Sequence, residues 1–228
     1  MKHSFTVNPI AYIQTDFKEK FGIPRQSGIA SESDGKIIFE KEYRRPEALR
    51  GIDGYTHLWL IWQFSESVRE GWSATVRPPR LGGNKRVGVF ATRSPFRPNP
   101  IGLSSVKLVG IEHSDEYGDM LIVKGADMLD GTPIYDIKPY LKYTDSHEDA
   151  QGGFADSVLS YKLSVNFPKE LIEKIPEDKR KPLLTALEND PRPGYKEDGE
   201  REYGMKYSDF EVFFTVKGEV LTVTRLSF

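Results

Sequence analysis

The 228-residue chain contains no cysteine, which excludes disulfide bonds, thiol nucleophiles and cysteine-ligated zinc. It has four histidines, and because no two stand at metal-ligand spacing the sequence predicts no metal site. It has no apolar run near the roughly 20 residues that a membrane span requires, and its N-terminus lacks the apolar core of a signal peptide. We therefore expect a cytoplasmic protein that binds neither a membrane nor a metal.

Three catalytic or nucleotide-binding signatures are also missing. There is no G-x-S-x-G elbow, so nothing supports a serine hydrolase of the α/β-hydrolase type. There is no G-x-x-x-x-G-K-[ST] phosphate loop, and no G-x-G triplet occurs anywhere in the chain. The last absence argues against a Rossmann site of the usual kind for a dinucleotide or a methyl donor.

Short apolar runs rich in β-branched and aromatic residues recur through the first two thirds of the chain, separated by Gly, Pro, Asp and Asn. Their spacing favours a mainly β fold, built as a barrel or a strongly bent sheet, over repeated strand–helix–strand units. A short helical turn is expected at Pro46–Arg50. The predicted strands are Phe5–Gln14, Lys36–Glu40, His57–Phe64, Val87–Thr92, Ser104–His113, Met120–Ala126, Pro133–Ile137 and Val158–Phe167.

The last third of the chain has a different pattern. Apolar residues at helical spacing over Lys169–Asn189, interrupted by two prolines, predict two short amphipathic helices. Two closing strands are expected at Asp209–Val216 and Val220–Leu226. We therefore expect a β domain over residues 1–165 and a small α+β C-terminal domain over residues 166–228.

The stretch Arg86–Ser104, RVGVFATRSPFRPNPIGLS, is the most distinctive of the chain. Its prolines fix φ and stiffen the loop, so Arg93, Arg97 and Asn99 stand on an ordered frame of the kind on which binding sites are built. The stretch belongs to a basic island, Gly71–Ile111, with seven basic and no acidic residues in a chain of net charge −2. The island predicts an anionic partner such as a nucleic acid. For the loop alone, a well-capped surface loop is the alternative.

Two polar clusters outside the basic island are candidates for a binding site. Pro24 stiffens a turn that presents Arg25 and Gln26, which together suit a carboxylate and a base edge or hydroxyl. A purely structural turn is the alternative. Ser65 and Glu66 emerge at the end of an apolar strand, where ligand edges are common.

A further cluster follows the turn Asp130-Gly-Thr-Pro133, which is an ordinary hairpin signal. Beyond this turn Asp136, Lys138 and Tyr140 stand at a spacing of two residues, which places all three on one face of a strand. A carboxylate, an amine and a phenol on one strand face indicate more than core packing. We consider these three as candidates for proton transfer.

Five motifs occur in order along the chain: PRQ, RPPRLGGN, GVFATRSPFRPNPIG, DGTPIYDIKPY and DPRPGY. With these motifs the chain resembles the TsaA-like family over nearly its whole length. The resemblance implies a single-sheeted β-barrel that uses S-adenosylmethionine and acts as a homodimer. It also implies an N6-methyltransferase whose substrate is threonine-accepting tRNA that carries N6-threonylcarbamoyladenosine at position 37.

Carried over to matching positions, the resemblance implies a cofactor pocket lined by Pro24, Arg25, Gln26, Ser65, Glu66, Arg93, Leu103, Asp130, Gly131, Thr132 and Pro133. The Ser–Glu pair departs from the His–Gln-like pair that relatives can show at that strand end. One of the basic or hydrogen-bonding groups on the strand face described above is expected to help remove the proton. The predicted RNA contacts are Arg77, Arg80, Lys85, Arg86, Arg97 and Arg192, the last with a structural turn as its alternative.

Two other functions remain open on the sequence. One is a non-catalytic RNA-binding β-barrel of the same fold, against which the intact PRQ and DGTP motifs and Arg93 argue. The other is a methyltransferase of the same fold that acts on a small molecule or on another modified nucleotide. The basic island and the C-terminal region favour tRNA over a small substrate.

Overall fold

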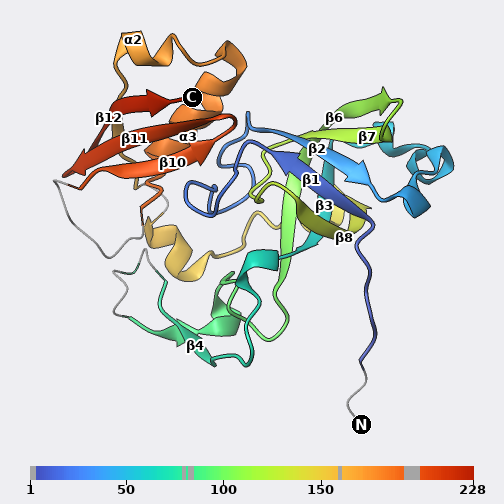
Figure 1. Cartoon of the computed structure of the whole chain (residues 1–228). Coiled ribbons are helices and arrows are strands. Elements are labelled where there is room, and N and C mark those ends of the chain that lie inside the picture. Colours follow the sequence, from blue (N-terminus) through green and yellow to red (C-terminus); the bar gives the residue numbers. More distant parts are fainter. Residues whose placement is uncertain (1–3, 79–80, 82–84, 159–160, 193–200) are drawn as a thin grey trace.

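The structure, a computed structural model, describes residues 4–78, 81, 85–158, 161–192 and 201–228 (Figure 1). Two β-sheets, each with its own hydrophobic core, form the larger part of it. The helices in the described ranges are short, and none of them combines the length and apolarity needed to cross a membrane.

The N-terminal sheet consists of six antiparallel strands. Their order, β1-β2-β7-β6-β3-β8, closes on itself because β1 pairs with both β2 and β8. On β3 the alternating sequence HLWLIWQ buries Leu58, Leu60 and Trp62, and all six strands add buried apolar residues to one core. The strands are β1 (Ala11–Thr15), β2 (Asp34–Phe39), β3 (His57–Gln63), β6 (Ile101–Ser114), β7 (Gly118–Lys124) and β8 (Thr132–Pro139).

The C-terminal sheet has the order β10-β11-β12-β9, in which β9 runs parallel to β12. Helix α3 packs against this sheet (Figure 1), because Leu183 and Leu187, one helical turn apart, share a core with Val212 and Phe214 of β11. The elements are β9 (Ser164–Asn166), α2 (Lys169–Ile172), α3 (Glu177–Glu188), β10 (Tyr203–Tyr207), β11 (Phe210–Lys217) and β12 (Val220–Ser227).

The connections contain short elements. Strands β4 (Thr75–Val76) and β5 (Val87–Gly88) form a two-stranded ribbon, and α1 (Lys142–Asp145) is a single-turn helix. Turns of 3₁₀ helix occur at Lys41–Tyr43, Pro46–Leu49, Ile52–Gly54, Ser65–Ser67, Val89–Ala91 and Gly153–Val158.

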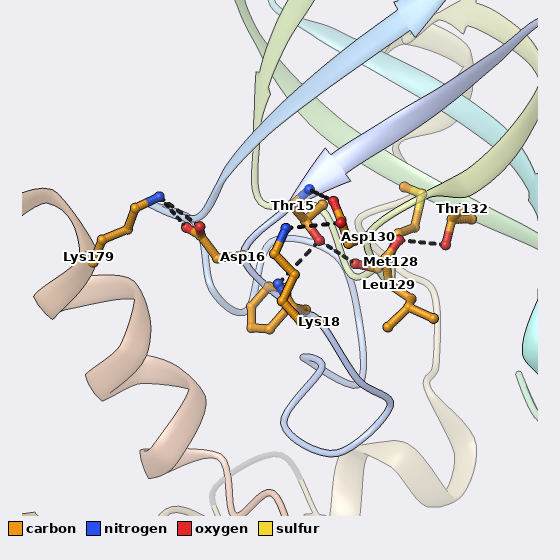
Figure 2. A network of polar contacts seen from close by, with 9 residues as sticks. Thr15, Asp16, Lys18, Met128, Leu129, Asp130, Thr132 and Lys179 are labelled. Carbon is orange, nitrogen blue, oxygen red and sulfur yellow. Dashed lines mark hydrogen bonds and ion pairs between the residues drawn. The ribbon is translucent and has the colours of Figure 1, made fainter. Parts of the chain in front are cut away.

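The segment that follows β1 joins the two sheets. Phe17 is buried within the C-terminal core, and its backbone pairs with that of Tyr207. Just before it, the carboxylate of Asp16 accepts two hydrogen bonds from Nζ of Lys179 on α3, at 2.7 and 2.6 Å (Figure 2). The C-terminal core therefore includes part of the N-terminal chain. The domain boundary near residue 165 remains a prediction.

The prediction of a mainly β fold is confirmed, as are the two C-terminal helices and the helical turn at Pro46–Leu49. The predicted strand Val87–Thr92 is wrong beyond Gly88, where a 3₁₀ helix begins. The reason is that, among the residues that the structure describes, β5 pairs only with the two-residue β4, so the ladder ends after two pairs. Helix α3 also continues through Pro182, which we expected to interrupt it.

Two other predicted strands are shorter than expected, and one strand was missed. The strand predicted from Phe5 begins only at Ala11. Within Val158–Phe167, the residues that the structure describes include only the three strand residues of β9. Strand β10 was not predicted, although Tyr203 and Tyr207 are buried at its ends. Its alternation lies beside a highly charged segment, which hid the signal.

Candidate functional site

A cleft of about 850 Å³ is lined by segments far apart in the sequence. Its walls come from the end of β3, the start of β6, the turn over residues 22–26 and the proline-rich loop over residues 89–100. Apolar side chains make up most of its surface, and the polar side chains among them include Arg25, Arg93 and Asp127. A concave, largely apolar site with a few convergent polar groups is typical of a small-molecule site.

The proline-rich loop is held by its own hydrogen bonds. The Thr92 hydroxyl donates to the Val89 carbonyl at 2.8 Å, and the Arg97 guanidinium donates to the Thr92 carbonyl at 3.1 Å. The Arg93 guanidinium donates to Oε1 of Gln26 at 2.5 Å, and both residues line the cleft. This contact joins the proline-rich loop to the turn that carries Arg25, two segments that the family resemblance implies as parts of one pocket.

The turn over residues 22–26 is fixed by the C-terminal region. Gly22 has φ of +95°, a backbone conformation that favours glycine, and a Cβ at this position would also overlap the Met205 side chain. The Arg25 guanidinium donates to the carbonyl oxygens of Asp190 and Arg192, at 3.3 and 3.0 Å. The C-terminal region therefore helps to set the position of an arginine in the cleft.

Asp190 and Arg192 form a buried ion pair. Nε and Nη2 of Arg192 donate to the two carboxylate oxygens at 2.9 Å each, and the side chains are 10% and 9% exposed. Burial acts to raise the pKa of Asp190, but the hydrogen bonds and charge of Arg192 hold this pKa below its ordinary value. Arg192 is thus engaged inside the protein, which favours its structural alternative over RNA contact.

Asp127 lines the cleft just beyond β7 and was not among the predicted site residues. Its Oδ1 accepts a hydrogen bond of 2.5 Å from the Ser104 hydroxyl, and Ser104 accepts one of 2.9 Å from Nε1 of Trp62. Burial raises the pKa of Asp127 above its ordinary value, although Ser104 and the charge of Arg93 act to lower it. A carboxyl group in such a setting is a candidate for acid–base chemistry.

The structure brings most of the predicted cofactor residues together. The cleft is lined by Pro24, Arg25, Gln26, Ser65, Glu66, Arg93, Leu103 and Thr132, and also by Arg97. Side chains that the sequence did not single out for this site, among them Lys20, Trp62, Phe64 and Asp127, complete the lining. Trp62 belongs to the core of the N-terminal sheet as well as to the cleft lining. An apolar strand end that borders a cleft has the same sequence pattern as one that only packs a core, so the sequence does not mark Trp62 and Phe64 as site residues.

Asp130, Gly131 and Pro133 lie outside the lining of the cleft. The Asp130 carboxylate accepts a hydrogen bond from the Thr15 backbone N–H at 2.9 Å and forms an ion pair with Nζ of Lys18 at 2.9 Å (Figure 2). Both of its oxygens are therefore engaged in anchoring the end of β1. This position gives the carboxylate a structural task in place of the predicted cofactor contact.

The three candidates for proton transfer also lie apart from the cleft. Asp136 and Lys138 do share a strand face, where their side chains form an ion pair of 2.8 Å and remain largely exposed. Tyr140 packs against the rings of His57 and Trp59, with centroids 6.1 and 5.5 Å away. The face of β8 that carries Asp136 and Lys138 is therefore the outer face of the sheet, and it points away from the cleft.

The predicted RNA contacts Arg77, Lys85 and Arg86 are exposed, whereas Arg80 lies outside the described residues. In the same part of the sequence, the rings of Trp72 and Phe90 lie 6.1 Å apart and are 56% and 72% exposed. Phe90 also lines the cleft. An exposed surface that combines cations with aromatic rings, next to a cleft, suits a nucleic acid whose bases can stack.

Two family models match the chain: the tRNA-methyltransferase O N-terminal domain over residues 12–146, and the TrmO C-terminal domain over residues 160–228. A protein of Escherichia coli named tRNA (adenine(37)-N6)-methyltransferase is 40% identical, covering 93% of this chain and 94% of its own. One of the same name from Eikenella corrodens is 45% identical, covering 72% of this chain and 92% of its own.

Solved structures agree with these matches. A crystal structure of TrmO from Pseudomonas aeruginosa superposes with a TM-score of 0.79 at 32% identity, over 100% of this chain and 98% of its own. The name of another Pseudomonas aeruginosa relative, 40% identical over 93% of this chain and 92% of its own, refers to S-adenosylmethionine-dependent methyl transfer. The membership that the five motifs predicted is confirmed: the chain belongs to the tRNA-methyltransferase O family.

Proposed function

We propose that this protein is an S-adenosylmethionine-dependent methyltransferase that methylates N6 of adenine 37 in tRNA. Its proposed substrate is threonine-accepting tRNA that carries the threonylcarbamoyl group on this nitrogen. The observation that carries the proposal is the cleft, which joins predicted cofactor residues of five separate segments in a chain of this family. The names of the relatives from Escherichia coli and Eikenella corrodens support the reaction and the position.

The residues of the cleft fit S-adenosylmethionine. Its volume of about 850 Å³ lies within the range of ligand pockets, ~300–1,000 Å³. Arg25 and Arg93 offer guanidinium groups for a carboxylate, and Glu66 offers an acceptor for an amino group or for ribose hydroxyls. Phe64 and Leu103 give apolar surface for an adenine ring. S-adenosylmethionine supplies a methyl group on a positively charged sulfur, which is already a good leaving group.

The protein's own part in such a transfer is to align the reacting atoms and to accept a proton. The attacking nitrogen is urea-like, so its lone pair is delocalised and its N–H is weakly acidic. The threonyl carboxylate next to it is an anion, and we propose that an arginine of the cleft lining, such as Arg97, neutralises it. We propose that Arg77, Lys85 and Arg86 contact phosphates beyond the cleft and that the protein acts as a homodimer.

The experiment that tests the proposal is mass spectrometry of nucleosides from threonine tRNA incubated with the pure protein and S-adenosylmethionine. The tRNA is supplied in two forms, with and without the threonylcarbamoyl group. We expect a gain of one methyl group only on the modified nucleoside. Arg93→Met is expected to abolish cofactor binding in calorimetry. The matched control is Lys85→Met, which removes an exposed cation outside the cleft lining and is expected to leave cofactor binding unchanged.

Two outcomes would overturn parts of the proposal. If S-adenosylmethionine binds but neither tRNA form is methylated, the cofactor assignment stands and the substrate assignment fails. If the wild-type protein does not bind S-adenosylmethionine while it still binds tRNA, the methyltransferase assignment fails and a non-catalytic RNA-binding protein replaces it.

A further inference from the structure

A chain of three hydrogen-bonded groups runs from the core of the N-terminal sheet to the cleft. It starts at Trp62 on β3, passes through Ser104 on β6 and ends at Asp127 after β7. An indole N–H is a donor only, so Ser104 accepts from Trp62 and keeps its own proton free to donate to the ionised Asp127 carboxylate. Trp62 and Ser104 are 5% and 1% exposed, so packing fixes both side chains.

The direction of these bonds matters for Asp127. Because Ser104 donates to Oδ1, this oxygen is held in place and acts as an acceptor in the ionised state. The backbone N–H groups of Ser27 and of Asp127 itself also stabilise the charged form. Burial outweighs these effects and leaves Asp127 with a raised pKa. The carboxylate is therefore both positioned and more basic than an exposed aspartate.

The charged groups around Asp127 are few. Arg93 of the proline-rich loop acts on it and lowers its pKa. The other charged side chains of the cleft lining are Lys20, Arg25, Glu66 and Arg97. No ion pair within 4.0 Å joins the Asp127 carboxylate to a cation in the described part of the chain. An ion pair with a cation lowers the basicity of an aspartate, and Asp127 forms no such pair within the described residues.

We propose that Asp127 is the group that accepts the proton of the attacking nitrogen, an inference that rests on the proposed methyl transfer. The N–H bond breaks, and its proton goes to the Asp127 carboxylate while the electron pair stays on nitrogen. The nitrogen pair forms the new bond to the methyl carbon, and the pair of the carbon–sulfur bond leaves with sulfur, which becomes neutral. Ser104 and Trp62 are positioning residues, because they act through Asp127.

The test compares Asp127→Asn with Asp136→Asn in single-turnover assays on threonylcarbamoylated tRNA. Asparagine keeps an oxygen that can accept from Ser104, so the fold should persist, but it cannot take up a proton. We expect the methyl-transfer rate of Asp127→Asn to fall by roughly 10²–10⁴-fold, the range for a general base. Asp136→Asn, which removes an exposed carboxylate outside the cleft, should stay within about threefold of wild type. S-adenosylmethionine binding, followed by calorimetry, should change by less than about threefold in both variants.

The pH dependence gives a second readout. The wild-type rate should rise with pH until Asp127 is ionised, at a pH above that of an ordinary aspartate, and Asp127→Asn should lose this dependence. Ser104→Ala removes a hydrogen bond that favours the charged form, so the rise should move to higher pH and the rate should recover there. A structural role alone would not produce this recovery.

The outcomes separate this inference from the proposed function. If the wild-type protein transfers no methyl group, the proposed function fails before Asp127 is tested. If wild type is active and Asp127→Asn keeps its rate within about threefold, with the pH dependence unchanged, the inference is wrong. The inference is also overturned if Ser104→Ala leaves the pH dependence where it was.

Discussion

Replacing Arg192 by methionine is expected to lower the free energy of unfolding by about 3 kcal/mol, because the Asp190 carboxylate would lose its cation inside the protein. Both side chains are about one-tenth exposed, so water cannot replace the lost partner. Removing one member of a buried pair costs about 3–5 kcal/mol. The low end applies because Asp190 keeps the Tyr161 hydroxyl, at 3.0 Å, and the backbone N–H of residue 192, at 3.2 Å.

The assay is urea unfolding of the full-length protein, with the change in midpoint converted through the slope of the transition. Lys138→Met is the matched control, since it removes the cation of an exposed pair with Asp136 and should leave the midpoint nearly unchanged. The double variant Asp190→Asn with Arg192→Met removes both charges. It should recover most of the lost stability, because asparagine tolerates the left-handed backbone at residue 190, where φ is 51°.

The same ion pair predicts an acid dependence. The pKa of Asp190 is lowered in the folded state, so its stabilisation is complete above the pKa of an unfolded aspartate, about 3.9. It is lost as the pH falls through the folded-state value. The difference between wild type and Arg192→Met should therefore shrink when unfolding is measured at successively lower pH below about 4.

The reasoning would be refuted if Arg192→Met unfolded within about 1 kcal/mol of wild type, or if the double variant were no more stable than the single one. A second consequence concerns the cleft. The carbonyl oxygens of Asp190 and Arg192 hold the Arg25 guanidinium, so loosening this turn should also weaken S-adenosylmethionine binding. Calorimetry at a temperature where Arg192→Met remains folded tests this point.

Three further predictions concern the cleft and the basic surface. Gly102→Ala would place a methyl group inside the Trp62 ring, so we expect a stability loss of about 1–3 kcal/mol in urea unfolding together with weaker cofactor binding in calorimetry. Lys85→Ala and Arg86→Ala should each lower the slope of log tRNA affinity against log salt by about 1, and an unchanged slope would exclude phosphate contact. Trp72→Ala should weaken tRNA binding by about 1–3 kcal/mol if a base stacks on this exposed ring, and should leave cofactor affinity unaltered.

The local elements were predictable where a pattern reports on burial directly. Strand β3 was predicted within one residue because Leu58, Leu60 and Trp62 alternate with less buried neighbours. The interruption at Val89 was not predictable, because a strand also needs a partner, and the length of β4 is a property of the tertiary structure. The turn carrying Arg25 and the proline-rich loop were both identified as site segments, since stiff turns that present polar side chains are visible in the sequence.

What the sequence could not supply is the set of contacts that strand pairing creates. Ser104 lies 42 residues after Trp62, and Asp127 lies 23 residues after Ser104. The three side chains meet because β3 pairs with β6 and β6 pairs with β7. A single aspartate between buried residues carries no pattern of its own. The motif DGTPIYDIKPY, in contrast, drew attention to Asp130 and Asp136.

These three aspartates show why an arrangement of partners, more than a motif, decides what a carboxylate can do. Asp130 is bound to Lys18 and the backbone of Thr15, so it holds a strand end. Asp136 is paired with Lys138 on an exposed strand face and lies outside the lining of the cleft. Asp127 alone among them lines the cleft, with a raised pKa and a neutral hydroxyl as its hydrogen-bonding side chain. A proton acceptor must lie within hydrogen-bond reach of the group it deprotonates, and of the three only Asp127 lines the cleft in which we propose that the transfer takes place.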